Sequence, residues 1–550
     1  LAAKTESETP LQALTSPQQQ ALASLRDDRN QTNRFLLHGV TASGKTEVYM
    51  HLIQEVIQQG KQVLFLVPEI ALTTQMIQRL YVHFGKSMAV YHSRYTSSER
   101  VEVWNKVLAQ DPSAQLIVGA RSAVLLPFSN LGLIIVDESH EVAYKQFESN
   151  PRYHARDVAV VLAGLHQSKI VMGSASPSIE SSHNSRTGKY NLVEIKERYR
   201  GFSMPAIGIV DLKLSQKKKQ MNGHFSQTLI DAISKTIAAE EQVILFQNRR
   251  GFSSFVNCTA CGHVPQCPSC DVSLTYHKQN EKLKCHYCGY HVLSHAHCVA
   301  CGTAQPKPMG LGTQQIETEI QQLFPDVRVG RMDSDTTKGK HGHRDLINRF
   351  TQHDLDILVG TQMLTKGLDF GRVTLVGVVL ADSLLNFQDF RAHERAFQML
   401  LQVSGRAGRK DRMGRVLIQS YDNNHLVLQQ LHQYDYDSMF SVQLKQREEF
   451  DYPPFVRLIR FELKHKNFSA LQEASNWFSQ ALHNQFSQVL GPQSPPVGRI
   501  RNQFLMQILL KLPASQSASP AKELLTRICK RFEQIPAFRS VILVIDIDPI

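Results

Sequence analysis

The chain of 550 residues contains a loop suited to binding the phosphates of a nucleotide. It reads GVTASGKT, directly after an apolar run at Phe35 to His38 and directly before an amphipathic helical pattern. Glycines let backbone N–H groups approach phosphates, Lys45 is expected to reach the β and γ phosphates, and Thr46 is expected to hold Mg²⁺. This context argues against a chance glycine-rich turn. The residues expected to bind ATP are Gly39, Val40, Thr41, Ala42, Ser43, Gly44, Lys45 and Thr46.

Two adjacent acids are the second chemical element. Asp137 and Glu138 end the apolar run of LIIVDESH, which predicts that they lie at the end of a buried strand. Asp137 is expected to bind Mg²⁺ and Glu138 to polarise the attacking water. Alone, such a pair is unremarkable. Together with the phosphate loop about ninety residues upstream, it predicts a nucleoside triphosphatase.

Two arginines form the third element, in the sequence QVSGRAGR at residues 402–409. Arginines on a facing lobe can stabilise charge that builds on the γ-phosphate. We therefore expect Arg406 and Arg409 to act in hydrolysis, which would require two lobes to close. The alternative is a solvated basic surface, and the flanking glycines disfavour it.

Eight of the nine cysteines lie between Cys258 and Cys301, in four CxxC pairs. In a cytosolic chain this spacing predicts zinc ligands and not disulfides. Eight thiolates make two closed tetrahedral sites with structural roles, and the nearby His263, His286 and His297 are expected to be exposed. Spacing alone does not decide which cysteines share an ion.

The elements that must position these residues repeat along the chain. Apolar runs alternate with helical patterns from about Leu11 to Ile195, and the same rhythm returns after a basic stretch, which predicts two α/β lobes with parallel sheets. The expected domains are a disordered or linker start (1–10), lobe 1 (11–210), a linker (211–225), lobe 2 (226–430) with a zinc-binding insertion (256–305), and a small α+β domain (435–550).

Composition is consistent with a globular nucleic-acid-binding protein. The net charge of +12 modestly favours a polyanionic partner. The apolar runs are far shorter than the ~20 residues that span a bilayer, so no membrane segment is expected. The chain starts at Leu1 without the features of a signal peptide, and we expect a cytoplasmic fragment of a longer protein.

Further motifs refine the class. Two lobes with these elements in this order resemble superfamily 2 helicases, in which both lobes are RecA-like. Over nearly the whole chain, from about Leu11 to the final IDIDPI, the sequence resembles the PriA (primosomal protein N-prime) family. The motifs that carry this resemblance are VPEIALT at 67–73, GARSA at 119–123, GSASPS at 173–178, NRRGF at 248–252, GLGT at 310–313 and GTQMLTKG at 360–367, with the CxxC pairs lying between NRRGF and GLGT.

The resemblance implies an ATP-dependent DNA helicase with 3′ to 5′ polarity that restarts replication at stalled or repaired forks and assembles the primosome. DNA, single-stranded-DNA-binding protein and primosome proteins are the expected partners. Gln18 matches the adenine-reading glutamine of the family, Arg406 and Arg409 match its arginine fingers, and Thr361, Gly367 and Asp369 lie in the block that couples nucleotide to DNA. The zinc ligands implied are Cys258, Cys261, Cys298 and Cys301 for one ion, and Cys267, Cys270, Cys285 and Cys288 for the other.

Residues 144–157 resemble the aromatic-rich loop of the family. Tyr144, Phe147 and Tyr153 are expected to stack on unpaired bases. The residues expected to meet phosphates are Lys145, Arg152 and Arg156. For any single ring, closing a minor core is a serious alternative.

Some features depart from the family pattern, among them Ser139, Ser176, Ser404 and Leu368, and none of them removes a phosphate or metal ligand. The family's N-terminal DNA-binding region has no counterpart before Leu11. Two other functions compete: another superfamily 2 enzyme, such as an RNA helicase or a translocase, and a non-enzymatic zinc scaffold. The zinc insertion and the GLGT block disfavour the first. The second is disfavoured by the intact Lys45, Asp137, Glu138 and Arg406.

Overall fold

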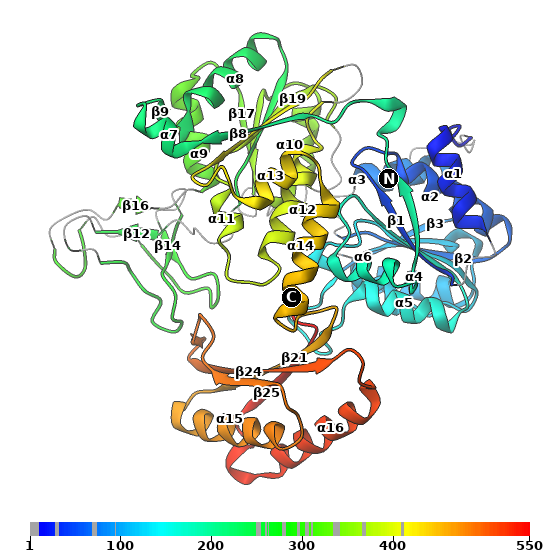
Figure 1. Cartoon of the computed structure of the whole chain (residues 1–550), viewed down its shortest axis with the longest axis vertical. Helices are drawn as coiled ribbons and strands as arrows, with labels where there is room; N and C mark the ends of the chain where they lie inside the picture. The colour runs from blue at the N-terminus through cyan, green and yellow to red at the C-terminus, as the bar shows by residue number, and fades with distance from the viewer. Residues whose placement is uncertain are drawn as a thin grey trace. The chain divides into compact units, whose positions relative to one another are not determined.

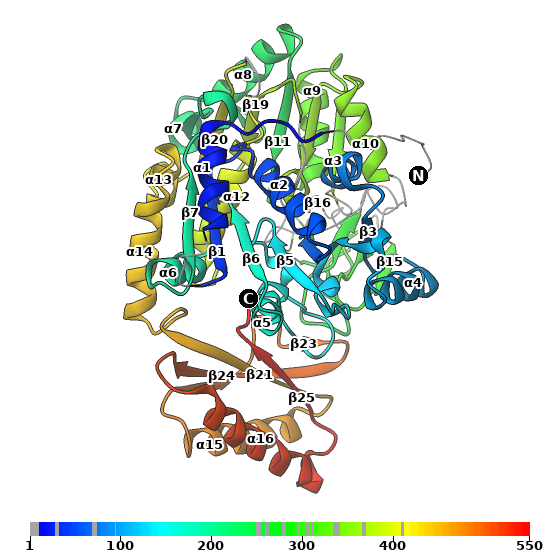
Figure 2. The same cartoon turned by 90° about the vertical axis from the view of Figure 1, so that its right-hand side faces the viewer.

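The computed structural model divides by its contacts into two compact units. Unit 1 comprises Leu1–Asn248 and Thr313–Gln443, and unit 2 comprises Arg249–Gly312 and Leu444–Ile550. Figures 1 and 2 give two views of the chain. The structure describes residues 10–27, 32–68, 74–93, 95–248, 255–258, 261, 263–277, 282–293, 297–302, 307–309, 312–333, 342–365, 370–408 and 412–550.

Lobe 1 of unit 1 is built on a seven-stranded parallel sheet in the order β3-β4-β2-β5-β6-β1-β7. The apolar runs expected as strands in this lobe all fall on strands, at 35–38, 63–67, 116–119, 133–136 and 170–173. The strands are β1 (Arg34–Gly39), β2 (Gln62–Leu66), β3 (Met88–Tyr91), β4 (Leu116–Gly119), β5 (Leu131–Val136), β6 (Lys169–Ser174) and β7 (Asn191–Ile195). The sequence did not indicate β3 and β7, which are the two edge strands.

Helices cover both faces of this sheet, as near-continuous apolar strands require. One core contains Leu25, Val48 and Leu80 from the helices of one face, and the other contains Val107 and Ala159. Figure 2 shows α1 and α2 side by side on the first face. The helices are α1 (Ser16–Arg26), α2 (Lys45–Gln58), α3 (Thr74–Phe84), α4 (Ser97–Leu108), α5 (Ala155–Leu165) and α6 (Ile179–Arg186).

Lobe 2 has a six-stranded parallel sheet in the order β17-β18-β11-β19-β20-β8. The strands are β8 (Ala206–Asp211), β11 (Gln242–Phe246), β17 (Val329–Met332), β18 (Ile357–Gly360), β19 (Val373–Val378) and β20 (Arg415–Ser420). The helices are α7 (Leu212–Lys217), α8 (Gln227–Ala238), α9 (Thr313–Leu323), α10 (Gly342–Thr351), α11 (Asp382–Leu385), α12 (Ala392–Ser404) and α13 (Leu426–His432). The short strands β9 (Met221–Asn222) and β10 (Phe225–Ser226) form a separate hairpin.

The expected linker at 211–225 is wrong. Residues 206–211 form β8, which pairs along its whole length with β20, and α7 follows at once. Ile207 and Val210 are buried by this pairing, so the chain has already entered lobe 2 before the basic stretch. The lysines at 217–219 end a short helix of lobe 2 and do not separate the lobes.

Unit 2 combines the cysteine region with the C-terminal domain. The cysteine region is an antiparallel sheet of β12 (Phe255–Asn257), β13 (Thr275–His277), β14 (Lys282–Lys284), β15 (His291–Leu293) and β16 (Lys307–Met309). The C-terminal domain has β21 (Val456–His465), β22 (Val489–Gln493), β23 (Arg499–Ile500), β24 (Gln503–Pro513) and β25 (Ile542–Ile547). Its helices α15 (Phe468–His483) and α16 (Ala518–Gln534) lie on one face of that sheet (Figure 1), and α14 (Tyr436–Glu449) leads into the domain.

The fold expected from the sequence, two parallel-sheet lobes with a cysteine-rich insertion and a C-terminal α+β domain, is confirmed. Among the described helices, none combines the length and apolar composition needed to cross a bilayer.

Candidate nucleotide site and metal centres

The phosphate loop joins β1 to α2 and has the backbone shape that anion binding needs. Ala42 and Gly44 adopt left-handed conformations, with φ of 60° and 79°, and α2 begins at Lys45. A helix N-terminus presents unpaired N–H groups to an anion. The Lys45 ammonium donates to the Gly39 carbonyl at 2.8 Å, and a Cβ on Gly39 would lie 2.7 Å from the Ser43 Oγ. The loop is therefore packed tightly enough to require glycine at its start.

Several buried polar atoms around this loop have no hydrogen-bond partner within the described part of the chain. They include the Thr41 and Ser43 hydroxyls and the Glu138 Oε2. Burying such atoms unpaired costs about 1–3 kcal/mol each. Phosphate oxygens, Mg²⁺ and an attacking water would supply the partners that these atoms lack. The site therefore fits a magnesium-bound nucleoside triphosphate.

Gln18 holds the phosphate loop from α1. Its side chain is buried, its Nε2 donates to the Ser43 carbonyl at 3.1 Å, and its Oε1 accepts from the Thr15 N–H at 2.9 Å. The contact fixes the loop backbone relative to the start of α1. Adenine recognition by this glutamine stays a prediction.

Asp137 follows β5 directly, as expected, and its carboxylate faces α2. The Tyr49 hydroxyl donates to Asp137 Oδ1 at 3.2 Å, and the Asp137 N–H donates to the Leu66 carbonyl. A Cβ on Gly173 would overlap the Tyr49 hydroxyl at 1.6 Å, so the glycine that opens GSASPS makes room for this contact. Burial and the neighbouring Glu138 raise the pKa of Asp137 to about 7. A bound Mg²⁺ would offset that shift, because a cation favours the carboxylate.

Tyr144 and Lys145 are corrections to the expected DNA-contacting set. Tyr144 is fully buried, and its hydroxyl donates to the Asp137 carbonyl at 2.6 Å and to the Leu66 carbonyl at 3.0 Å. Lys145 is 1% exposed, and its ammonium donates to the Arg152 carbonyl at 3.0 Å. A buried ring cannot stack on a base, so Tyr144 instead ties the aromatic-rich loop to the residue that follows β5.

The rest of the aromatic-rich loop is more accessible. Phe147 is 39% exposed, and Arg152 and Tyr153 are half-buried. The Arg156 guanidinium donates to Asp157 at 3.0 Å and to the Ser178 hydroxyl at 3.2 Å. Of the three rings expected to stack on DNA, Phe147 is thus the one on the surface, and its contact with DNA stays a prediction.

Lobe 2 contacts lobe 1 through one face of α12. Glu394 Oε1 accepts from the Ile179 N–H, which is the first of α6, at 2.9 Å, and Gln398 Nε2 donates to the Ser176 carbonyl at 3.2 Å. Gln402 Nε2 lies 2.9 Å from His140 Nε2. Residues four apart share a helix face, so Glu394, Gln398 and Gln402 form one stripe on α12. This stripe contacts the segment that follows β6 and the histidine of DESH.

His140 joins the two lobes. Its Nδ1 lies 2.7 Å from the Ser174 hydroxyl, and its Nε2 faces the amide donor of Gln402. This geometry requires Nε2 to accept and Nδ1 to carry the proton, since an amide N–H₂ can only donate. One ring, two residues after Glu138, therefore connects the DESH segment with the end of β6 and with the helix that leads to Arg406.

The arginine motif lies against the phosphate loop. A Cβ on Gly405 would come within 2.8 Å of the Thr41 side chain, and the Arg198 guanidinium donates to the Gly408 carbonyl at 3.1 Å. Arg406 is half-buried next to this contact. Arg409, Gly367 and Asp369 lie outside the described residues, whereas Thr361 follows β18.

Sequence reasoning missed Tyr49, His140, Glu394 and Gln398. Only Glu394 and Gln398 carried a usable signal, because with Gln402 they place a polar residue at every fourth position of the apolar segment AHERAFQMLLQVS. Tyr49 reads as an ordinary core residue of an amphipathic helix.

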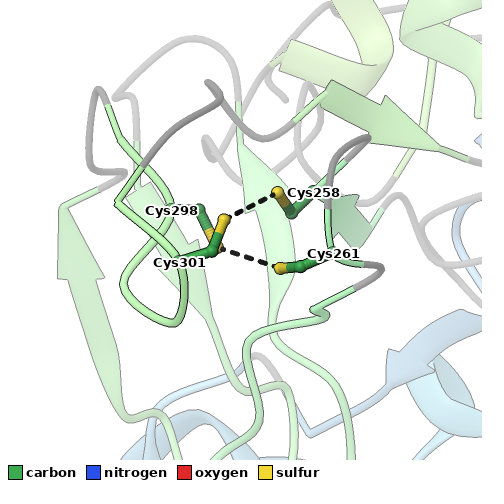
Figure 3. A group of neighbouring side chains, drawn as sticks. All are labelled: Cys258, Cys261, Cys298 and Cys301. Carbon is green, nitrogen blue, oxygen red and sulfur yellow. Dashed lines mark hydrogen bonds between the residues drawn. The ribbon is translucent and has the colours of Figure 1, made fainter.

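The eight cysteines form two groups of four, each with its sulfur atoms within 4.8 Å of one another. The nested arrangement expected from the resemblance is confirmed: Cys258, Cys261, Cys298 and Cys301 form the first cluster, and Cys267, Cys270, Cys285 and Cys288 form the second. In the first cluster (Figure 3), the Cys258 and Cys301 sulfurs are 3.6 Å apart. Four convergent thiols without a disulfide fit tetrahedral Zn²⁺.

Four family models match successive parts of the chain. Residues 15–184 match the DEAD/DEAH box helicase family, and residues 310–411 match the helicase conserved C-terminal domain. Residues 267–292 match the PriA DNA helicase Cys-rich region domain. Residues 448–550 match the primosomal protein N C-terminal domain. The matches follow the lobes, the second cysteine cluster and the C-terminal domain.

Curated relatives cover almost the whole chain. It is 40% identical to replication restart protein PriA of Bacillus subtilis over 98% of its own length and 66% of the relative's. The identity to the protein of that name in Haemophilus influenzae is 38%, covering 98% of this chain and 72% of the relative. The identity to the Rickettsia conorii protein of that name is 36%, covering 98% of this chain and 81% of the relative. The chain spans about two thirds of the Bacillus subtilis protein. Its identity of 38% and 36% to relatives that it covers to 72% and 81% shows that it belongs to the PriA family of replication restart proteins.

Proposed function

We propose that this chain is an ATP-dependent DNA helicase that acts in replication restart. The observation that carries the proposal is the meeting of three elements within unit 1. The phosphate loop and the acid pair lie on lobe 1, and the arginine motif of lobe 2 abuts the loop at Thr41 and Gly405.

The residues of lobe 1 divide the chemistry of ATP hydrolysis. Lys45 would leave the Gly39 carbonyl and contact the β and γ phosphates, and Thr46 and Asp137 would hold Mg²⁺. Glu138 would orient the attacking water, because its buried Oε2 has no hydrogen-bond donor within the described residues and can accept a hydrogen bond from that water. Magnesium supplies charge neutralisation of the triphosphate when bound.

Lobe 2 completes the site. Arg406 would stabilise negative charge on the γ-phosphate, as an arginine from a facing lobe does in related phosphoryl transfers. Arg409 is proposed to assist it. The Gln402–His140 and Glu394–Ile179 contacts favour the closed arrangement of the lobes. Hydrolysis would then depend on closure.

DNA stimulation has a physical route in Tyr144. The aromatic-rich loop carries the exposed Phe147, and the Tyr144 hydroxyl binds the Asp137 carbonyl at 2.6 Å. A base that stacks on Phe147 would move the loop and shift the backbone of the acid pair. We therefore propose that single-stranded DNA stimulates ATP turnover.

The finer assignments rest on the family. The relatives carry the name replication restart protein, which supports the proposed action in replication restart at stalled or repaired forks. The 3′ to 5′ polarity and primosome assembly are proposed from the sequence resemblance alone. Single-stranded-DNA-binding protein and primosome proteins are the proposed partners, and the proposed location is cytoplasmic. Each cysteine cluster is proposed to hold one structural Zn²⁺.

Unwinding of synthetic forks tests motor, polarity and substrate together. Forks with a duplex lagging arm and either a 3′ or a 5′ single-stranded tail are compared, with ATP and with a nonhydrolysable analogue. Unwinding of the fork with the 3′ tail in the presence of ATP, and not with the analogue, supports the proposal. Unwinding from the 5′ tail contradicts the polarity, and the absence of ATP-dependent unwinding on any fork contradicts the helicase assignment.

A further inference from the structure

A hairpin of the C-terminal domain ends on the second cysteine cluster. Strands β23 and β24 pair through Ile500 and Gln503, which leaves Arg501 and Asn502 as a two-residue turn. Both turn residues have positive φ, 51° and 60°, as a tight hairpin turn of this type requires. The hairpin tip is therefore a defined structure and not a loose loop.

The second cluster is made by two CxxC turns, here called knuckles, at Cys267 to Cys270 and at Cys285 to Cys288. Backbone groups of the hairpin tip form hydrogen bonds with the first knuckle and the residue after it. The Arg501 N–H donates to the Cys270 sulfur at 3.2 Å, the Asn502 N–H donates to the Ser269 carbonyl at 2.8 Å, and the Asp271 N–H donates to the Arg499 carbonyl at 2.9 Å. Two of these bonds join backbone to backbone, one in each direction, and fix the register of the contact, while the third is accepted by the Cys270 side chain.

Side chains extend the same contact. The Arg501 guanidinium donates to the Tyr287 carbonyl at 3.1 Å, within the other knuckle of the cluster. The Arg499 guanidinium donates to the Asp271 carboxylate at 3.0 Å. Ile500 packs against the small core formed by Cys267, Cys270, Cys285, Leu274 and Leu283. The tip thus touches both halves of the second cluster.

The second cysteines of the two CxxC pairs, Cys270 and Cys288, obtain their N–H···S bonds differently. At Cys288 the donor is local: the Tyr290 N–H lies 3.4 Å from the sulfur, and Gly289 turns the chain with φ of 83°. At Cys270 the residue after the cysteine is Asp271, and the Val272 N–H bonds to the Cys270 carbonyl at 2.9 Å. The donor to the Cys270 sulfur instead comes from Arg501, which is 231 residues later in the chain.

We propose that the hairpin at residues 499–502 supports the second zinc site through the N–H that it donates to the Cys270 sulfur. Zinc bound there would in turn hold the cysteine region against the C-terminal domain, and we call this mutual stabilisation the latch. N–H donors to a ligating thiolate stabilise its charge, and outer-shell partners are worth about 10- to 100-fold in metal affinity. The inference rests on the proposed zinc binding. It adds that one of the two metal ions joins parts of the chain that are far apart in sequence.

The latch predicts that zinc at the second cluster and the hairpin protect each other. Zinc release to a chromogenic chelator is followed for the full chain, beside total zinc content. Ile500→Asp places a carboxylate in the small core and is expected to accelerate release of one zinc by about tenfold. Ile542→Asp is the matched control, since Ile542 is 48% exposed on β25, and it should release zinc as the unmodified chain does.

Amide hydrogen exchange in the unmodified chain gives a second measurement that needs no variant. Removing zinc should increase exchange at the Arg501 and Asn502 amides and leave the central β24 amides protected. Suppose the chain holds two zinc ions. The latch is then overturned, and the zinc assignment stands, if Ile500→Asp releases zinc at the unmodified rate or if chelation leaves exchange at the hairpin amides unchanged. Fewer than two zinc ions per chain contradicts the zinc assignment and the latch with it.

Discussion

Glu394 offers the sharpest perturbation of lobe closure. Its carboxylate, on lobe 2, accepts the first N–H of α6 on lobe 1 at 2.9 Å, and the side chain is 3% exposed. A negative charge at a helix N-terminus is favourable, and more so when partly buried. Glu394→Ala removes both the charge and the acceptor, whereas Glu394→Gln keeps an acceptor oxygen.

The magnitude follows from the burial of both partners. A hydrogen bond to a charged group contributes about 1.5–3 kcal/mol, and an orphaned buried N–H is costly. We expect Glu394→Ala to destabilise the closed lobes by about 2–3 kcal/mol, which is roughly 30- to 150-fold in the closure equilibrium. Glu394→Gln should cost about 1 kcal/mol, roughly fivefold. Because the proposed hydrolysis requires closure, DNA-stimulated turnover should fall by up to these factors.

The assay is ATP turnover at saturating ATP and single-stranded DNA, combined with hydrogen exchange at the Ile179 amide. Exchange at Ile179 should increase in the order unmodified, Gln, Ala, and turnover should decrease in the same order. Glu240→Ala is the matched control, since Glu240 is exposed on the same lobe. Faster exchange at Ile179 with full turnover would refute the dependence of hydrolysis on this contact.

Three further predictions concern the site on lobe 1. Lys45→Ala should lower ATP turnover by about 100-fold or more while DNA binding, measured by fluorescence anisotropy, is retained; retained hydrolysis would contradict the phosphate contact. Asp137→Asn should raise the melting temperature of the metal- and nucleotide-free chain more at pH 8 than at pH 5. Burial raises the folded-state pKa of Asp137 to about 7, so its carboxyl lowers stability progressively as pH rises from about 4 through 7. Equal melting shifts at both pH values would exclude this. Tyr144→Phe removes the bonds to the Asp137 and Leu66 carbonyls and should reduce DNA stimulation of turnover by about 5- to 30-fold while DNA binding is retained. Phe147→Ala should weaken DNA binding as well as stimulation. Full stimulation in Tyr144→Phe would remove Tyr144 from the coupling route.

The sequence predicted the fold well because its strands are buried on both faces. The runs at Val63 to Val67 and Ile357 to Gly360 are continuous apolar segments, which leave little choice but a parallel sheet flanked by helices. The edge strands were missed because they are not buried on both faces. Strand β7, for example, reads NLVEI, and its exposed positions break the apolar run. The end of lobe 1 expected at residue 210 was wrong because residues 206–211 form β8, which pairs with the distant β20, and no local pattern indicates this long-range pairing.

The chemical residues were predictable where a motif fixes a backbone, as at Lys45 and Asp137. Residues that act through contacts with distant segments were not. Tyr144 lies in an aromatic-rich segment whose composition indicates a surface loop, yet its hydroxyl has two carbonyl acceptors in the core of lobe 1. Arg501 precedes an ordinary strand, and only the folded C-terminal domain brings its N–H to Cys270.

The central claim is that a nucleoside triphosphate binds between the phosphate loop and the arginine motif and holds the lobes closed. The most direct test is an experimental structure of the chain with Mg²⁺ and a nonhydrolysable ATP analogue. The account predicts phosphates on residues 39–46, the metal beside Thr46 and Asp137, and the Arg406 guanidinium directed to the γ-phosphate. An analogue bound elsewhere, or a phosphate loop that stays empty at saturating concentration, would contradict it.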